Sequence, residues 1–256
     1  MRTRWGIRSD TQIQVGIGTA LTGTIRQKLK QPGKAYLFGL CICDMPYLST
    51  ASGTIKWQIR QGQIQITSCG PTSAAMLVDY WRSELGLSSL GAQFVVKHAL
   101  NNHLYLPDDQ EQIYTRPANM VSIVQDLLDT DIMSERLMVV SGQTSSTPSA
   151  AKAVLLDLLS QGYPVIVDVT VSTLQGEANN AHFVVVTGMD SAGKVYFHDP
   201  YSRGDFNEDG IIEWDETGGA KRAVSWENFY WAWTHNSDAD VGGIGWWMTL
   251  QPADWR

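Results

Sequence analysis

Cysteine is scarce in this 256-residue chain, which contains only Cys41, Cys43 and Cys69. Three cysteines cannot all pair, and side chains two residues apart on a strand point the same way, so Cys41 and Cys43 are badly placed to bridge each other. A disulfide framework is therefore not expected. Cys41 and Cys43 also lack the two-residue gap and the second ligand pair that are typical of structural zinc sites. The remaining thiol, Cys69, has to be explained by its own surroundings.

The chain also lacks a long apolar run and an excess of basic residues. Because no apolar stretch has the length of a bilayer, no membrane span is expected. The 19 Lys and Arg against 26 Asp and Glu give a net charge of −7, and without a basic stripe nucleic acid is not an expected partner. Internal repeats and charged tails are absent too. What is abundant is apolar, with 43% hydrophobic residues and ten tryptophans, which indicates a globular protein with a substantial core.

Cys69 opens the segment Cys69-Gly70-Pro71-Thr72 at the start of a predicted helix over residues 71–85. Pro71 suits a first helical turn, where its missing N–H costs nothing, and Gly70 permits the close approach of a substrate or another backbone. An apolar stripe at helical spacing follows: Ala74, Ala75, Leu77, Val78 and Trp81. A thiol at this position faces unpaired N–H groups and the positive end of the helix dipole, which favour the thiolate.

Two downstream residues supply what a thiolate nucleophile requires. His182 begins a β-branched run that ends at Gly188, and Asp199 follows a second predicted strand that Pro200 terminates. Residues 189–193 have the composition of a turn, so the two strands are predicted to form a hairpin that brings His182 and Asp199 side by side. A base to accept the thiol proton and an acceptor to fix the tautomer of that base are both then available.

Each of these residues also has a plain structural interpretation. A lone cysteine is often a small buried hydrophobe, a lone histidine a hydrogen-bonded core residue, and an aspartate before proline the start of a turn. Only the combination of Cys69, His182 and Asp199 favours a catalytic hypothesis.

These three blocks, Cys69-Gly70-Pro71-Thr72, the strand that begins at His182 and the segment His198-Asp199-Pro200-Tyr201, resemble the papain-like cysteine peptidases. The most similar type is the bacteriocin-leader-processing (double-glycine) peptidases and their stand-alone relatives, and the resemblance covers residues 56–251. It implies an α+β papain-like fold, with a helical half that carries the nucleophile and an antiparallel β half that carries His and Asp. It further implies that Cys69 attacks a carbonyl, that His182 is the general base and that Asp199 orients it.

The resemblance also implies a glutamine upstream of the cysteine as an oxyanion-hole donor. The spacing in the family, six positions before the cysteine, selects Gln63. Gln58, Gln61 and Gln65 are alternatives in the same stretch. A side-chain amide together with the Cys69 backbone N–H would stabilise a developing oxyanion.

A twelve-residue stretch after Asp199, residues 205–216, fits the calcium loop of an EF-hand. The predicted oxygen ligands at the positions of that loop are Asp205, Asn207, Asp209, Ile211 through its carbonyl, Glu213 and Glu216. Gly210 occupies the position of the sharp turn. The flanking residues do not indicate helices, so the expectation is an isolated, structural calcium site; the alternative is a solvated acidic turn.

The domain organisation is predicted as residues 1–52, a β-rich N-terminal extension of unknown role with strands at 12–18 and 22–27, followed by a catalytic domain over residues 53–256. Within that domain the patterns predict helices at 71–85, 93–103, 117–128, 148–159 and 226–233, strands at 165–171, 182–188, 194–198 and 245–250, and a polar loop at 141–149. Helices followed by strands are typical of an α+β fold.

The expected function is therefore that of a cysteine peptidase acting on a peptide or protein substrate. An acyl transferase or cyclase would use the same three residues, and a non-catalytic calcium-stabilised binding module is the alternative from another class. A calcium site favours an extracellular location, whereas the only basic-then-apolar segment, residues 28–43, starts too late for a secretion signal. The compartment stays open.

Overall fold

The protein is described here by a computed structural model that covers residues 39–42, 45–46, 68–104, 106–107, 113–130, 132–144, 147–170, 181–200, 222–235 and 244–253. Several predictions lie outside these residues and stay predictions. They are the N-terminal strands at 12–18 and 22–27, the four upstream glutamines and the calcium loop at 205–216. The proposed boundary near residue 52 also lies outside them.

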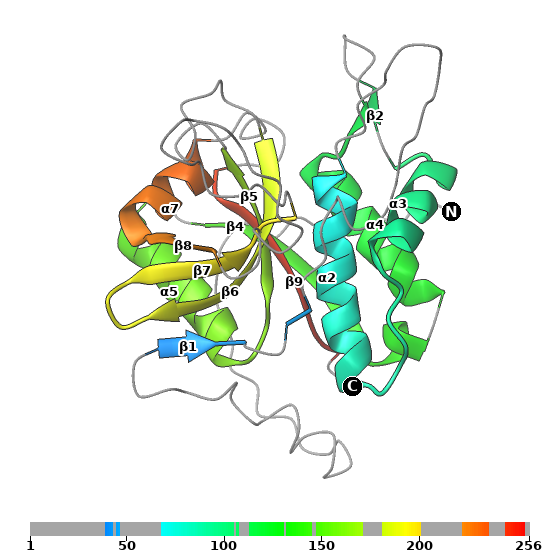
Figure 1. Cartoon of the computed structure of the whole chain (residues 1–256), viewed down its shortest axis with the longest axis horizontal. Helices are drawn as coiled ribbons and strands as arrows, with labels where there is room; N and C mark the ends of the chain where they lie inside the picture. The colour runs from blue at the N-terminus through cyan, green and yellow to red at the C-terminus, as the bar shows by residue number, and fades with distance from the viewer. Residues whose placement is uncertain are drawn as a thin grey trace, which may run out of the picture.

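Three helices form the helical half and lie on one side of the sheet (Figure 1). They are α2 (Cys69–Glu84), α3 (Ala92–Asn101) and α4 (Pro117–Asp129). The predicted helices are confirmed with shifts of a residue or two at their ends, as expected where helix ends fray. Asp79 fixes the connection between α2 and α3, because its carboxylate accepts the backbone N–H groups of Leu90 at 2.7 Å and Gly91 at 3.0 Å.

Seven of the described strands form one antiparallel sheet, ordered β4-β9-β5-β6-β7-β8 with β1 paired to β6. Their bounds are β1 (Gly39–Cys41), β4 (Leu137–Gln143), β5 (Val165–Thr170), β6 (Ala181–Asp190), β7 (Lys194–His198), β8 (Arg222–Ser225) and β9 (Trp246–Pro252). The C-terminal strand β9 thus lies between β4 and β5. The short strands β2 (Leu106–Pro107) and β3 (Ile113–Tyr114) form a separate ribbon, and η1 (Ile132–Glu135) is a single 3₁₀ turn before β4.

The predicted hairpin that positions the site is confirmed as β6 and β7. Gly193 in its turn has φ of +83°, which favours glycine. The Asp190 side chain accepts the Lys194 backbone N–H at 2.8 Å, and the Asp190 carbonyl accepts the Gly193 N–H at 3.0 Å. This Asx-type turn sets the register in which the two strands continue toward His182 and Asp199.

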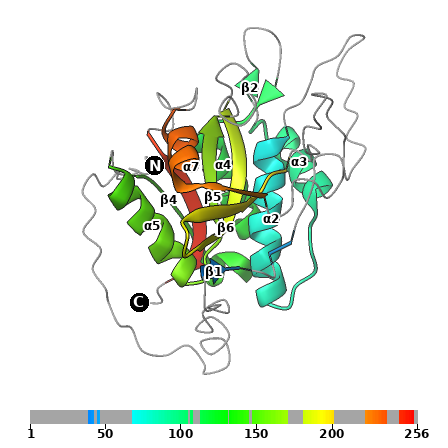
Figure 2. The same cartoon turned by 60° about the vertical axis from the view of Figure 1, so that its left-hand side comes forward.

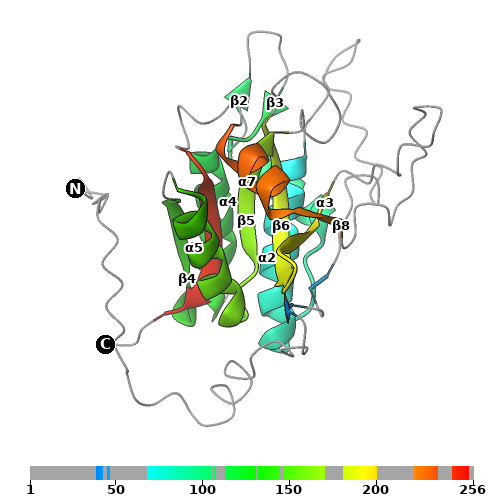
Figure 3. The same ribbon diagram turned by 90° about the vertical axis from the view of Figure 1, so that its left-hand side faces the viewer.

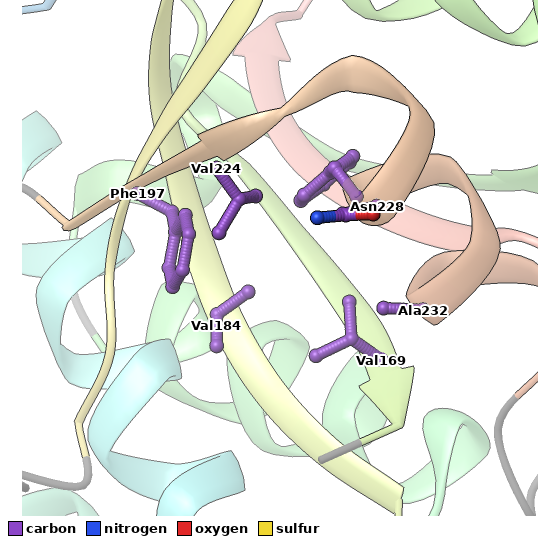
Figure 4. A pocket seen from close by; sticks show the side chains of 7 residues that line it. Val169, Val184, Phe197, Val224, Asn228 and Ala232 are labelled. Carbon is purple, nitrogen blue, oxygen red and sulfur yellow. The ribbon is translucent and has the colours of Figure 1, made fainter. Parts of the chain in front are cut away.

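Helices α5 (Pro148–Ser160) and α7 (Trp226–Thr234) cover the side of the sheet opposite α2 (Figures 1 and 2). Figure 3 shows α7 lying across β5 and β6. A small apolar cavity remains between α7 and the sheet (Figure 4), and its lining consists of Val169, Val184, Phe197, Val224, Asn228, Phe229 and Ala232. Trp233 of α7 is fully buried, and its Nε1–H donates to the carbonyl of Trp246 in β9 at 2.7 Å. The aromatic residues near the C-terminus therefore contribute largely to packing.

The main differences from the predicted elements are β4 and β8. The end of β4 falls within residues 141–149, whose composition is that of a polar loop. β4 is an edge strand in which only Leu137 is buried and the other six residues are half-buried or exposed, so its C-terminal half can be polar. Because β4 lies between α4 and α5 along the chain, the predicted order of helices before strands holds only in part. None of the helices in the described segments has the length and apolar character needed to span a membrane.

Candidate active site

The nucleophile candidate, Cys69, is the first residue of α2 and is half-buried. Ser68 precedes it without a side-chain cap, and the first turn contains no acidic residue. The N–H groups of that turn therefore have no competing anion among their own side chains, and the helix dipole is available to the sulfur. The backbone N–H of Gly70 donates a hydrogen bond to the Cys69 side chain.

Gly70 is required by a close approach, although the neighbour is another helix segment. A Cβ at this position would lie 2.8 Å from Sδ of Met120 and 2.9 Å from Cβ of Thr115. Both contacts are shorter than side chains tolerate, so a glycine here allows the start of α4 to pack against the start of α2.

The β half supplies His182 and Asp199 from adjacent strands. His182 is the second residue of β6, opposite Val169 of β5, and Asp199 directly follows β7. Nε2 of His182 lies 2.7 Å from Oδ1 of Asp199, and the two side chains are only 7% and 4% exposed. An ionisable pair this deeply buried is retained only with good hydrogen-bond geometry.

The imidazole of His182 lies between Asp199 and the sulfur of Cys69, to which it is also hydrogen-bonded. Since Nε2 faces Asp199, Nδ1 is the ring nitrogen left for Cys69. The structure therefore brings together the three residues that the sequence predicts, although 113 positions separate Cys69 from His182 and 17 separate His182 from Asp199 (182 − 69 and 199 − 182).

Burial and neighbouring charges have opposing effects on the pKa values of His182 and Cys69. Burial alone lowers the pKa of His182, but the charge of Asp199 and its hydrogen bond, with the contact to Cys69, raise that pKa to about 10. Burial alone raises the pKa of the Cys69 thiol, but the hydrogen bond and charge of His182, with N–H groups of Phe183 and Gly70, lower it overall. Both directions favour a thiolate beside an imidazolium over a neutral thiol and imidazole.

Phe183 connects the two halves of the site through its backbone. Its N–H donates to the Cys69 side chain. Its carbonyl accepts the hydroxyl of Ser73 at 3.1 Å. Cys69 and Ser73 are four residues apart and thus lie on one face of α2. One turn of α2 therefore engages both the backbone N–H and the backbone carbonyl of Phe183, the neighbour of His182, and fixes the distance between nucleophile and base.

A fourth charged residue reaches the site without having been predicted. Nη1 of Arg222, the first residue of β8, lies 3.5 Å from Oδ2 of Asp199. The sequence around Arg222 contains no motif, and only the pairing of β8 with β7 brings it there, so no pattern could have identified it. His198, next to Asp199, interacts elsewhere, with Nε2 at 3.3 Å from the carbonyl of Met45.

The remaining predicted site residues lie outside the described segments. Gln63, its alternatives, and the calcium ligands of residues 205–216 are all among them. Within the described segments, no group of three or more His, Cys, Asp or Glu side chains is arranged to hold a metal ion. Nε2 of His98 in α3 lies 3.7 Å from Oδ2 of Asp126 in α4.

Comparison with known proteins identifies the family of the chain. A sequence profile described as the Peptidase_C39 like family matches residues 45–233, and the chain belongs to this family. The antiparallel sheet flanked by helices is the α+β papain-like fold that the resemblance implies.

A crystal structure of a Bacillus anthracis protein described as a C39-like peptidase is similar at 15% identity, covering 83% of this chain and 97% of that one with a TM-score of 0.45. A search of curated protein sequences found no match. Membership of a peptidase family implies a peptide or protein substrate.

Proposed function

We propose that the protein is a cysteine peptidase in which Cys69 is the nucleophile, His182 the general base and acid, and Asp199 the residue that orients and charges His182. The observation that carries this proposal is the position of the His182 imidazole, hydrogen-bonded to Asp199 at 2.7 Å on one side and to Cys69 on the other. The raised pKa of His182 and the lowered pKa of Cys69 support the proposal, because they favour the thiolate, which is the reactive form of cysteine.

The proposed reaction begins when the Cys69 thiolate attacks the carbonyl carbon of a peptide bond and pushes the carbonyl electrons onto oxygen. The backbone N–H of Cys69, and the Gln63 amide inferred from family spacing, are proposed to stabilise that oxyanion. Collapse of the intermediate breaks the C–N bond as His182 donates its proton to the leaving amine. The product is a thioester on Cys69 and a free amine.

Hydrolysis of the thioester completes the cycle. His182, now neutral, takes a proton from water as the water oxygen attacks the thioester carbon, and Cys69 leaves as a thiolate. An amine in place of water would give acyl transfer with the same three residues. The geometry of the described residues does not favour that outcome over hydrolysis.

The test uses a probe that needs no known substrate. Iodoacetamide at neutral pH should label Cys69 well ahead of Cys41 and Cys43, as read by peptide mass spectrometry. A peptide library should then be cleaved by the wild-type chain and not by C69A. Labelling of Cys69 no faster than the other two thiols would exclude an activated thiolate and leave the binding-module alternative. Products carrying an added amine acceptor would instead indicate the transferase.

We also infer a structural calcium ion at residues 205–216, on the sequence pattern alone. Calcium in excess should raise the melting temperature, and D209N with E216Q should abolish that rise, since both are predicted ligands. An unchanged melting temperature on adding calcium to chelator-treated protein would contradict the site.

A further inference from the structure

The carboxylate of Asp199 has a different partner on each oxygen. Oδ1 is 2.7 Å from Nε2 of His182, and Oδ2 is 3.5 Å from Nη1 of Arg222. Asp199 is almost fully buried, whereas the Arg222 side chain is 22% exposed. The contact to Arg222 is an ion pair without a hydrogen bond, because Nη1 has no hydrogen-bond partner among the described residues. Its charge attracts Oδ2 and so favours the carboxylate orientation that directs Oδ1 at the imidazole.

The fold, and not local sequence, brings Arg222 to this position. Arg222 lies opposite Phe197 in the β7–β8 ladder, and residues directly opposite each other in a ladder project to the same face. Asp199 follows Phe197 by two residues, which is the spacing that returns a side chain to that face. A four-residue strand, β8, is therefore enough to bring the guanidinium to the carboxylate.

Apolar side chains shield one side of this contact. Val184, Phe197 and Val224 each stand two residues from His182, Asp199 and Arg222 respectively, and all three line the cavity under α7 (Figure 4). This apolar row lowers the local dielectric next to the polar row, so the charge of Arg222 acts on the site more strongly than a solvated arginine would.

The charged and titratable groups around His182 come from every packed element. Cys69 faces it from α2, Asp199 from the end of β7, and Arg222 reaches Asp199 from β8. Asp168 of β5 is opposite Phe183, the neighbour of His182, and is buried with interactions of its own. Among these described groups Arg222 is the cation whose charge does not depend on pH in the working range.

We propose that Arg222 is a positioning residue that holds Asp199 for His182 and, through its fixed charge, extends thiolate formation at Cys69 to lower pH. This inference rests on the proposed function, because it assigns Arg222 a role in the charge network of the same three residues. Removing Arg222 should hinder formation of the Cys69 thiolate in two ways. A carboxylate that can rotate stabilises the imidazolium beside the thiolate less well, and the loss of a nearby positive charge makes deprotonation of the thiol less favourable.

The experiment measures the rate of Cys69 alkylation by iodoacetamide against pH, with peptide mass spectrometry to separate Cys69 from the other thiols. R222Q should move the acid limb of the profile to higher pH by about one pH unit, the shift that ~1.4 kcal/mol of lost charge interaction would give. R222K, which keeps the charge, should leave the limb near that of the wild type. R136Q is the matched control, since Arg136 adjoins β4 at the opposite edge of the sheet from β8.

The outcomes separate this inference from the proposed function. If the wild-type Cys69 reacts no faster than an ordinary thiol at pH 6, the proposed function fails. If the wild type is activated but the acid limb of R222Q coincides with it, only the role of Arg222 is overturned. A purely structural role would lower the labelled fraction without moving the limb. If R222Q does not fold, R222K is the deciding variant. An acid limb at the same pH as in the wild type supports the role of the Arg222 charge, and an acid limb at higher pH overturns it.

Discussion

Two histidine–aspartate pairs lie within the described part of the chain, and they share their chemistry but not their surroundings. His182 and Asp199 meet at 2.7 Å between strands β6 and β7, with side chains 7% and 4% exposed. His98 and Asp126 face each other at 3.7 Å between α3 and α4, with side chains 15% and 45% exposed. In the first pair low dielectric strengthens the interaction, and in the second water and salt screen it.

This difference indicates that residue type alone does not make a catalytic pair. The buried pair also has a third member, because His182 contacts the sulfur of Cys69. His98 instead stacks on the ring of Phe94, one helical turn away, with ring centres 6.3 Å apart. His182 faces a thiol with which it can exchange a proton, whereas the Phe94 ring on which His98 stacks has no exchangeable proton. The two pairs can therefore serve as each other's controls.

The largest difference is expected when the base itself is removed from each pair. H182Q should reduce kcat/KM on a cleaved library peptide by roughly 10³-fold, since the thiol loses its proton acceptor and the leaving amine loses its donor. H98Q should leave kcat/KM within a factor of two of the wild type. Both variants would be checked by circular dichroism for folding. Similar losses in the two variants would remove the distinction between the pairs.

The second prediction exchanges each aspartate for its amide. D199N should lower kcat/KM by roughly tenfold, less than H182Q, because an amide oxygen still accepts a hydrogen bond from Nε2 but carries no charge to support the imidazolium. D126N should have no measurable effect, as expected for a screened surface pair. A D199N enzyme as active as the wild type would mean that the burial of this pair serves stability alone.

Stability against pH gives a third test of the same contrast. The pKa of His182 is raised from 6.5 to about 10 in the folded state, so its contribution is fully present below pH 6.5 and lost as pH rises toward 10. Cys69 has a lowered pKa, so its contribution is present above pH 9.0 and lost as pH falls, which opposes His182 over part of the range. Replacing the thiol by C69S removes that opposition.

In the C69S background the free energy of unfolding, measured with urea, should therefore fall between pH 6.5 and 10. Asp199 provides the largest of the effects that raise the pKa of His182, so adding D199N should flatten that slope. Adding D126N should leave it unchanged. A slope that survives D199N would assign the pH dependence to groups other than the buried pair.

The sequence predicts the buried pair better than its surroundings, for physical reasons. His182 and Asp199 lie in a hairpin whose strands and turn are local patterns, so their proximity follows from alternation and turn composition. Cys69 can be identified from the sequence because Gly70 and Pro71, which follow it, indicate the start of a helix. Arg222 carries no such signal, because its contact depends on which strand pairs with β7. Ser73 likewise is an ordinary helical position until the packing of α2 on β6 is known.

The same limit explains the element that sequence patterns do not identify. β4 is an edge strand paired only with β9, and its register spans seven residue pairs from Leu137 to Gln143. Pairing with a strand more than a hundred residues away supplies its hydrogen bonds. Its own apolar run, residues 137–140, is only four residues long and is followed by polar residues and a glycine, so it does not stand out as a strand. Strands β5 and β6, by contrast, are buried on both faces, and they contain the continuous apolar runs 165–167 and 183–186.

The smallest expected effect concerns two serines that extend the buried–exposed comparison to neutral hydrogen bonds. Ser73 donates to the Phe183 carbonyl at 3.1 Å across the α2–β6 contact, whereas Ser122 donates to the Ala118 carbonyl at 3.3 Å within α4 on an exposed surface. S73A should reduce the free energy of unfolding by about 1 kcal/mol, because a buried carbonyl loses its partner. S122A should change it by less than about 0.5 kcal/mol.

The activity of these two variants carries the more informative readout. Because Ser73 fixes the turn of α2 that bears Cys69 against the strand that bears His182, S73A should slow Cys69 alkylation at pH 6 by about threefold even where the protein is fully folded. S122A should leave that rate unchanged. Equal alkylation rates in S73A and the wild type, with the expected loss of stability, would show that the Ser73 contact stabilises the fold without setting the distance between sulfur and imidazole.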